Sequence, residues 1–214
     1  MEKLPNILIT GTPGCGKTQH CERLKELLNF KFFNVSEMVK EYGYHLGRDE
    51  EYDTLILDED KVLDHLEGPI AEGGCIVDHH TCDFFPERFF QLVVVLRCNN
   101  TVLYDRLHAR GYSELKLQEN LEAEIMQVVK DMADESYSSD VVVELTSESP
   151  EELEDNCQRI IAWIRGYMQS KTVTEEYCSD GEEDDWMYRW RGSWSVYTQS
   201  QSVILDLCYI RYHA

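Results

Sequence analysis

One stretch of this sequence decides its fold: Gly11-Thr12-Pro13-Gly14-Cys15-Gly16-Lys17-Thr18 matches the phosphate-binding pattern G-x-x-x-x-G-K-[ST] at every fixed position. The glycines let the backbone turn tightly, so that its N–H groups point inward at phosphate oxygens. In such loops the lysine, here Lys17, reaches the β- and γ-phosphates, and the Thr18 hydroxyl is a ligand for Mg²⁺. The pattern therefore predicts an ATP-binding loop between a strand and a helix.

The sequence on both sides of this loop supplies the strand and the helix that the pattern requires. Residues 6–10 are a short apolar run, which predicts a strand. Beyond Lys17, the side chains of Cys21, Leu24, Leu27 and Leu28 fall on one face at helical spacing. The helix presents the positive end of its dipole to the same anion, which favours phosphate binding.

Strands and helices alternate along the rest of the chain. Further strands are predicted at 32–35, 74–78, 92–96 and 141–145, and further helices at 58–67, 101–110 and 115–137. Ser149, Pro150 and Glu152 form the capping signature of a last helix that runs to about Met168. This alternation predicts an α/β domain with a parallel sheet.

The charge balance of the chain limits its partners. The 214 residues carry 20 Lys and Arg against 41 Asp and Glu, a net charge of −21. This acidity argues against direct binding of nucleic acid phosphates and favours a basic protein partner.

The eight cysteines have no metal-ligand spacing, which predicts reduced thiols in an intracellular protein. No apolar run is long enough to span a membrane.

A carboxylate and two histidines follow the third predicted strand. Asp78 ends that strand, where P-loop enzymes place the carboxylate that holds magnesium through water. His79 and His80 come next, and a histidine there either orients a water and relays a proton or satisfies an ordinary hydrogen bond. If the strand continues, His80 shares the face of Asp78, whereas His79 points away.

Arginines gather in the second half of the chain, at positions 88, 97, 106 and 110. Phosphoryl transfer spreads negative charge over equatorial oxygens, so enzymes of this kind collect arginines around the site. Each of these arginines is also compatible with a surface ion pair, and Arg110 is the strongest candidate for the site. Arg110-Gly111-Tyr112 at a helix end predicts a hinge into a lid that excludes water.

With these residues in place, the sequence resembles the adenylate kinase family, and within it the isoenzyme 6 type, the coilin-interacting nuclear ATPase proteins. Besides the loop, the resemblance rests on the segments 5–8, 49–53, 56–60, 76–80, 82–88, 102–104 and 110–112. It covers about residues 4–170. It implies a P-loop domain over residues 1–170 with a five-stranded parallel sheet, an AMP-binding segment near 34–57 and a short lid near 109–119.

The resemblance implies transfer of the γ-phosphoryl group of Mg-ATP to AMP, together with ATPase activity. The catalytic residues would be Lys17, Asp78, His80 and Arg110, and Thr18 and Asp78 would hold Mg²⁺. ATP would contact Gly11, Thr12, Pro13, Gly14, Cys15, Gly16, Lys17, Thr18, Gln19, Arg106 and Arg110, and AMP would contact Asn34, Lys40, Asp78 and Arg88. Lys40 stands where the family commonly has an arginine, and because a lysine lacks the guanidinium fork, we expect weaker AMP binding.

The resemblance also implies a monomer that acts in maturation of the small ribosomal subunit through a basic small-subunit ribosomal protein. A location in nucleus and cytoplasm is expected, and its nuclear part rests on the resemblance alone. Three alternatives stay open: a partner-controlled conformational ATPase, a nucleotide-gated adaptor, and another small P-loop kinase acting on a metabolite. Residues 171–214, acidic and containing Trp186, Trp190 and Trp194, are expected to form a poorly ordered extension.

Overall fold

The computed structural model describes residues 3–49 and 54–178. It divides the chain into two units, residues 1–162 and residues 163–214, and the site discussed below belongs to the first. The segment 50–53 and the tryptophan-containing region from residue 179 onward lie outside the described residues, and so do the expectations that concern them.

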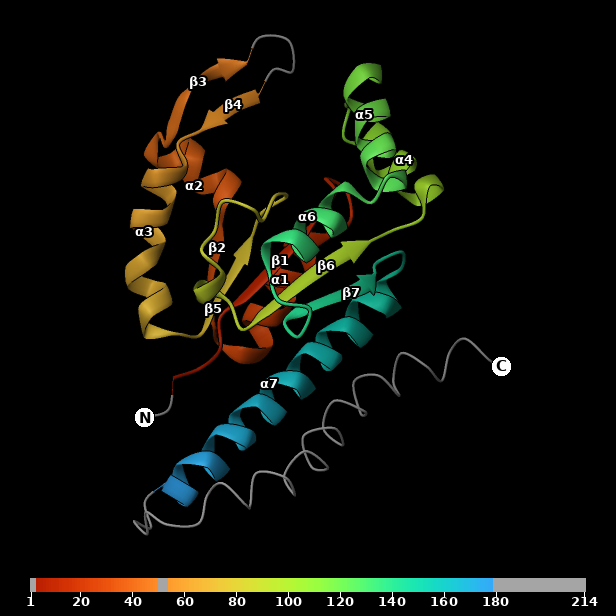
Figure 1. The fold of residues 1–214 in the computed structure, drawn as a ribbon. Coiled ribbons are helices and arrows are strands. Elements are labelled where there is room, and N and C mark those ends of the chain that lie inside the picture. The colour runs from red at the N-terminus through yellow and green to blue at the C-terminus, as the bar shows by residue number, and fades with distance from the viewer. Residues whose placement is uncertain (1–2, 50–53, 179–214) are drawn as a thin grey trace, which may run out of the picture. The chain divides into compact units, whose positions relative to one another are not determined.

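The first unit is built on a parallel sheet of five strands (Figure 1). The strands are β1 (Ile7–Gly11), β2 (Lys31–Asn34), β5 (Cys75–Asp78), β6 (Leu92–Arg97) and β7 (Val142–Thr146), in the spatial order β2-β5-β1-β6-β7. All neighbouring pairs in this sheet are parallel. The predicted fold class, an α/β P-loop domain with a five-stranded parallel sheet, is therefore confirmed.

The helices of the described residues are α1 (Lys17–Leu28), α2 (Val35–Tyr42), α3 (Glu59–Glu72), α4 (Asn100–Ala109), α5 (Glu114–Ile125), α6 (Val128–Ser136) and α7 (Pro150–Cys178), with a single 3-10 turn at Glu87–Phe89. Two antiparallel strands, β3 (His45–Asp49) and β4 (Thr54–Leu57), form a hairpin. Figure 1 shows this hairpin and α5 on either side of the end of the sheet that is formed by the carboxyl ends of β1, β5 and β6. Among these helices none is both long and apolar enough to cross a membrane.

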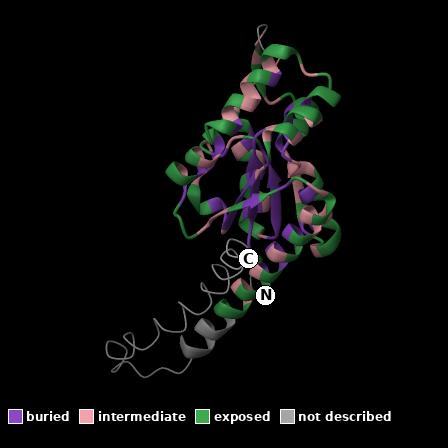
Figure 2. Ribbon diagram, turned by 90° about the vertical axis from the view of Figure 1, so that its right-hand side faces the viewer, coloured by how far each residue is buried: buried purple, intermediate pink, exposed green. Residues whose placement is uncertain are grey.

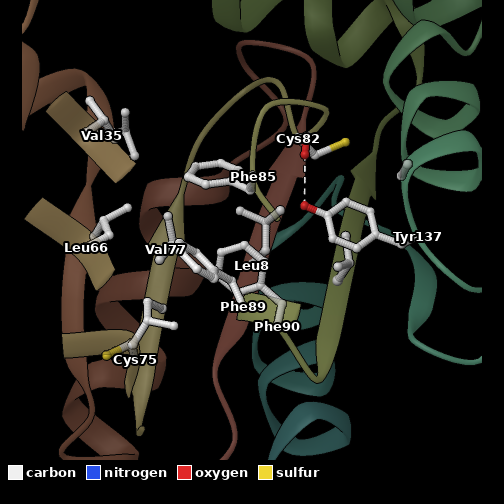
Figure 3. Close-up of a cluster of buried hydrophobic side chains, with 14 of the residues drawn as sticks. Leu8, Val35, Leu66, Cys75, Val77, Cys82, Phe85, Phe89, Phe90 and Tyr137 are labelled. Carbon is white, nitrogen blue, oxygen red and sulfur yellow. Dashed lines mark hydrogen bonds between the residues drawn. The ribbon is translucent and has the colours of Figure 1, made fainter. Parts of the chain in front are cut away.

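Both faces of the sheet are buried, which explains the continuous apolar runs of its central strands (Figure 2). On one face, Leu8, Val77 and Val93 pack into a cluster with residues of α2, α3 and α6 (Figure 3). The Tyr137 hydroxyl donates a hydrogen bond of 2.8 Å to the carbonyl oxygen of Cys82 in this cluster. The cluster holds the segment that follows β5 against the sheet, which fixes the surroundings of the strand end that carries Asp78.

The structure differs from the sequence-based expectation in three places. Helix α2 and the hairpin β3–β4 were not predicted. The single helix expected over 115–137 is two helices, because Gln127 adopts a left-handed conformation with φ 58° between them. Helix α7 continues beyond Lys171 to Cys178, so the extension expected from 171 onward begins as helix.

Candidate nucleotide-binding site

The backbone of the loop between β1 and α1 has a positive φ at three glycines, Gly11, Gly14 and Gly16, and the first two also lie against neighbouring elements. Gly11 has φ 141°, and a Cβ there would lie 2.4 Å from the carbonyl oxygen of Leu96 on the neighbouring strand. Gly14 has φ 102°, and its Cβ would lie 2.6 Å from a methyl group of Leu103 on α4. The glycines of the pattern therefore serve both the turn and the close packing of the loop against β6 and α4.

Lys17, at the start of α1, bends back over the loop. Its ammonium donates hydrogen bonds to the carbonyl oxygens of Gly11 at 2.7 Å and Thr12 at 3.2 Å. Burial lowers the pKa of Lys17, while the negative charge of Asp78 opposes that shift. The side chain thus places a cation at the loop, where a bound phosphate would replace carbonyl oxygens as its partner.

Thr18 and Asp78, the two residues predicted to hold magnesium, are in direct contact. The Thr18 hydroxyl donates a hydrogen bond of 2.6 Å to Oδ2 of Asp78. The strand register explains the contact, because Asp78 pairs with Ile9 of β1 and so ends beside the loop. Asp78 is 4% exposed, and this burial raises its pKa. The hydrogen bond from Thr18 and the positive charge of Lys17 both lower the pKa of Asp78 and so oppose the effect of burial. A hydroxyl and a carboxylate this close are the kind of oxygen donors that Mg²⁺ prefers.

The two histidines after β5 have different surroundings. The His79 ring is buried against Phe84 and Phe85, and its Nδ1 accepts a hydrogen bond of 3.2 Å from the backbone N–H of Thr81. Burial lowers the pKa of His79 to about 3. His79 thus packs the turn, although part of it also borders the cleft described next.

His80 is the more accessible of the two rings, and it lines the same cleft. Although solvent reaches the ring, the surrounding protein removes enough water to lower its pKa to about 4, and the positive charges of Lys17 and Lys116 add to this effect. A neutral imidazole at this place is able to orient a water molecule through a ring nitrogen, whereas its lowered pKa makes it a weak proton acceptor.

The loop opens into a cleft of about 850 Å³. It extends from the loop to α2 and the hairpin on one side and to the start of α5 on the other, and its described lining is Pro13, Gly14, Gly16, Lys17, Thr18, Gln19, Asn34, Ser36, Val39, Lys40, Arg48, Thr54, Leu55, Leu57, Glu59, Asp78, His79, His80, Thr81, Arg110, Tyr112 and Lys116. Five of these are cationic, Lys17, Lys40, Arg48, Arg110 and Lys116, in a chain that has only 20 Lys and Arg. Such a concentration of positive charge in an acidic chain suits a polyanionic ligand.

Several predicted residues have other roles in the structure. Arg106 reaches no cleft surface, and instead donates to the carbonyl oxygens of Gly14 at 3.2 Å, Ser147 at 2.8 Å and Glu148 at 3.0 Å. It therefore supports the loop from outside. The Arg88 side chain is 73% exposed, lies 3.8 Å from a carboxylate oxygen of Glu67, and is not part of the cleft lining.

The remaining loop residues also divide between cleft and interior. Pro13, Gly14, Gly16 and Gln19 line the cleft, and Gly11, Thr12 and Cys15 do not. The Thr12 side chain is buried, and the Cys15 sulfur lies 3.7 Å from that of Cys98. Asn34 lines the cleft but its side chain also caps α2, since its Oδ1 accepts from the N–H of Glu37 at 3.2 Å.

Sequence reasoning did not single out three residues that matter here. Arg48 on β3 and Ser36 on α2 line the cleft, but neither residue stands in a recognisable motif. Glu124 on α5 is buried beneath the loop, where its carboxylate accepts hydrogen bonds from Arg97 and from the Thr12 hydroxyl. A charged residue on a polar helix gives no sequence signal for such burial. Arg97, considered above as a phosphate ligand, is instead the partner of Glu124.

Comparison with known proteins supports this assembly. A family model described as an AAA domain matches residues 7–127. The chain is 50% identical over 187 residues to the adenylate kinase isoenzyme 6 homolog FAP7 of Saccharomyces cerevisiae, covering 85% of this chain and 95% of that protein. It is 51% identical over 173 residues to the adenylate kinase isoenzyme 6 homolog of Caenorhabditis elegans, covering 80% and 95%.

Solved structures of low sequence identity share the fold. Shikimate kinase from Bacteroides thetaiotaomicron superposes with a TM-score of 0.54 at 17% identity, covering 76% of this chain and 99% of that one. At this level of identity the likeness concerns the fold alone. The chain therefore shares the fold of that kinase, with a phosphate-binding loop between the first strand and the first helix.

Proposed function

The chain belongs to the adenylate kinase isoenzyme 6 family, and on that premise we propose that it transfers the γ-phosphoryl group of Mg-ATP to AMP. The single observation that carries this proposal is the distribution of positive charge along the cleft. Lys17 stands at the phosphate-binding loop, whereas Lys40 and Arg48 stand on α2 and β3, at the end of the cleft lined by residues 34–57, for which AMP binding is proposed. A cleft with cations at both ends suits two nucleotides whose phosphates meet between them.

In the proposed reaction, different residues of the site bind ATP, hold the metal and stabilise the transferred group. In this proposal the loop N–H groups and Lys17 bind the β- and γ-phosphates of ATP, and Thr18 and Asp78 would hold Mg²⁺. When bound, the metal neutralises charge on the β- and γ-phosphate oxygens. Arg110 and Lys116 line the same cleft, and in this proposal they stabilise the charge that spreads over the transferred group.

On the acceptor side, Lys40 and Arg48 hold the phosphate of AMP, so that one of its oxygens attacks the γ-phosphorus in line with the leaving ADP oxygen. Asn34 borders the same space from the start of α2. Arg88 joins this side only if the segment that carries it moves, because it now faces Glu67.

A second activity, hydrolysis of ATP, is favoured by His80. Its ring lines the cleft and its pKa is lowered to about 4, so it is neutral at pH 7 and able to orient a water molecule. In this reaction water takes the place of AMP.

We extend the proposal to a partner that controls the rate of ATP hydrolysis, a basic small-subunit ribosomal protein during ribosome assembly in the nucleus and cytoplasm. The net charge of −21 supports a basic partner, and the remaining support is the family resemblance.

The two activities are separated by following ADP and free phosphate in the same reaction. The protein is incubated with Mg-ATP, with and without AMP. ADP formation that depends on AMP and releases no phosphate supports the kinase. Phosphate release that AMP does not change, but a basic partner does, supports the ATPase or adaptor reading instead. Lys17→Ala abolishes both activities, whereas Lys25→Ala, an exposed lysine on the same helix, retains them.

A further inference from the structure

A buried carboxylate lies on the side of the phosphate-binding loop away from the cleft. Glu124, in the last turn of α5, is 3% exposed. Its carboxylate accepts hydrogen bonds from the Thr12 hydroxyl, from Nε of Arg97 at 2.6 Å and from the backbone N–H of Cys98 at 3.3 Å. In addition, Nη2 of Arg97 donates to the Glu124 carbonyl oxygen at 3.0 Å. One side chain thus joins α5, the loop and the end of β6.

Such a burial needs a reason, because removing a carboxylate from water is unfavourable unless charge and hydrogen bonds compensate. Arg97 supplies the charge, but an Arg97–Glu124 pair alone needs no contact with the loop. Arg97 has a second carboxylate partner, Glu144 at 3.4 Å, which is more exposed and has no contact with Thr12. Glu124 differs from Glu144 in binding the loop itself.

The position of Glu124 along α5 connects the loop with the cleft entrance. Lys116, in the first turn of the same helix, lines the cleft. The two residues are eight positions apart, or about 12 Å along a helix axis. A movement of α5 toward a bound nucleotide at the Lys116 end is therefore transmitted through a stiff helix to the side chain that holds Thr12.

We propose that Glu124 is a positioning residue, which fixes the phosphate-binding loop through Thr12 and couples phosphate binding in that loop to the placement of α5 over the cleft. The proposal rests on the nucleotide-binding part of the function proposed above, and it does not require that AMP be the acceptor. It makes the carboxyl end of α5 part of the phosphate-binding apparatus, although Glu124 touches no ligand.

The test compares variants that break the link from either side. Thr12→Val removes the hydroxyl but keeps the shape, and leaves the Arg97–Glu124 pair intact. Glu124→Gln keeps the shape and removes the charge. Glu144→Gln is the matched control, because it also removes an Arg97 ion pair but does not concern the loop. The readout is ADP affinity by titration calorimetry, with urea unfolding in the absence of nucleotide measured in parallel.

We expect Thr12→Val and Glu124→Gln each to weaken ADP binding about tenfold, and the double variant also about tenfold rather than a hundredfold, since both changes break one link. Glu144→Gln binds ADP as the unmodified chain does. A role limited to stability would lower the unfolding free energy and leave ADP affinity unchanged. ADP affinity within twofold of the unmodified chain in both single variants would overturn the proposal, and Thr12→Val decides it if Glu124→Gln fails to fold.

Hydrogen exchange tests the coupling to α5. In the unmodified chain, ADP increases the protection of the α5 backbone amides, and in Thr12→Val at saturating ADP this increase is lost. Unchanged α5 protection in that variant would overturn the coupling. If the chain binds ADP and shows this pattern but does not phosphorylate AMP, the kinase proposal fails and the role of Glu124 stands.

Discussion

The Thr18 hydroxyl lies 2.6 Å from Oδ2 of Asp78, although the two residues are 60 positions apart in the sequence. The contact joins the first turn of α1 to the end of β5 and sets two oxygen atoms, the proposed ligands of Mg²⁺, side by side at the phosphate-binding loop. We expect Asp78→Asn to lower Mg-dependent turnover about 100-fold, because an amide oxygen is a poor substitute for a carboxylate that holds the metal. Steady-state kinetics with Mg-ATP measures this loss.

The control for this variant is Asp83→Asn, which changes an exposed carboxylate shortly after β5. It is expected to retain normal turnover. ADP binding measured without metal is expected to survive in Asp78→Asn, since the loop and Lys17 remain. Turnover of Asp78→Asn equal to that of the unmodified chain would remove Asp78 from the metal site.

Lys40 lines the cleft, and in the proposed function it binds the phosphate of the acceptor AMP. An arginine offers two parallel N–H donors to a phosphate, whereas a lysine offers a point charge. We therefore expect Lys40→Arg to lower the KM for AMP by up to about tenfold, equivalent to about 1.4 kcal/mol, and Lys40→Met to raise it. The KM for ATP in the same assays serves as the internal control. An AMP KM indifferent to both substitutions would place the acceptor elsewhere.

Arg106 is hydrogen-bonded to the phosphate-binding loop and does not line the cleft. Its guanidinium donates hydrogen bonds to three carbonyl oxygens, those of Gly14, Ser147 and Glu148. Arg106 thereby links the loop to the segment after β7. Arg106→Met is expected to reduce the free energy of unfolding without nucleotide by about 2 kcal/mol, because charged hydrogen bonds are lost. Urea titration measures this value. An unchanged free energy of unfolding, together with weaker ATP binding, would restore Arg106 to the role of a direct ATP ligand.

His79 makes stability depend on acidity. Burial lowers its pKa from 6.5 to about 3, so the folded protein holds the neutral ring. The resulting contribution to stability is complete above pH 6.5 and is lost as the pH falls from 6.5 toward 3. As the pH falls through this range, we expect the free energy of unfolding of the unmodified chain to decrease by about 1.4 kcal/mol more per pH unit than that of His79→Asn. In that variant the amide oxygen replaces Nδ1 as an acceptor. Urea unfolding at pH 7 and pH 5 compares them, and equal losses would contradict the assignment.

The parts of the fold and site that could be predicted are those set by local sequence. The loop pattern fixed Lys17 and Thr18 because tight turns and phosphate ligands need particular residues at particular spacings. Asp78 followed from its place at the end of an apolar strand. The sheet followed from continuous apolar runs that alternate with helical patterns.

The remaining features depend on partners distant in sequence. Arg106 and Arg88 were expected at the phosphates, yet the carbonyl oxygens around Arg106 and the carboxylate near Arg88 come from other elements that no local pattern reveals. The hairpin that carries Arg48 lacks the alternation of a strand buried on one face, and its residues are largely exposed. Gln127 adopts φ 58° where a glycine would have signalled the break between α5 and α6.

The most direct measurement of the central claim is the fate of AMP labelled in its adenine ring. The protein is incubated with labelled AMP and unlabelled Mg-ATP, and the nucleotides are separated at several times. Transfer to AMP predicts that the label appears in ADP, with one labelled ADP formed for each ATP consumed and no phosphate released. Label that stays in AMP while ATP is converted to ADP and free phosphate would contradict the kinase and leave an ATPase.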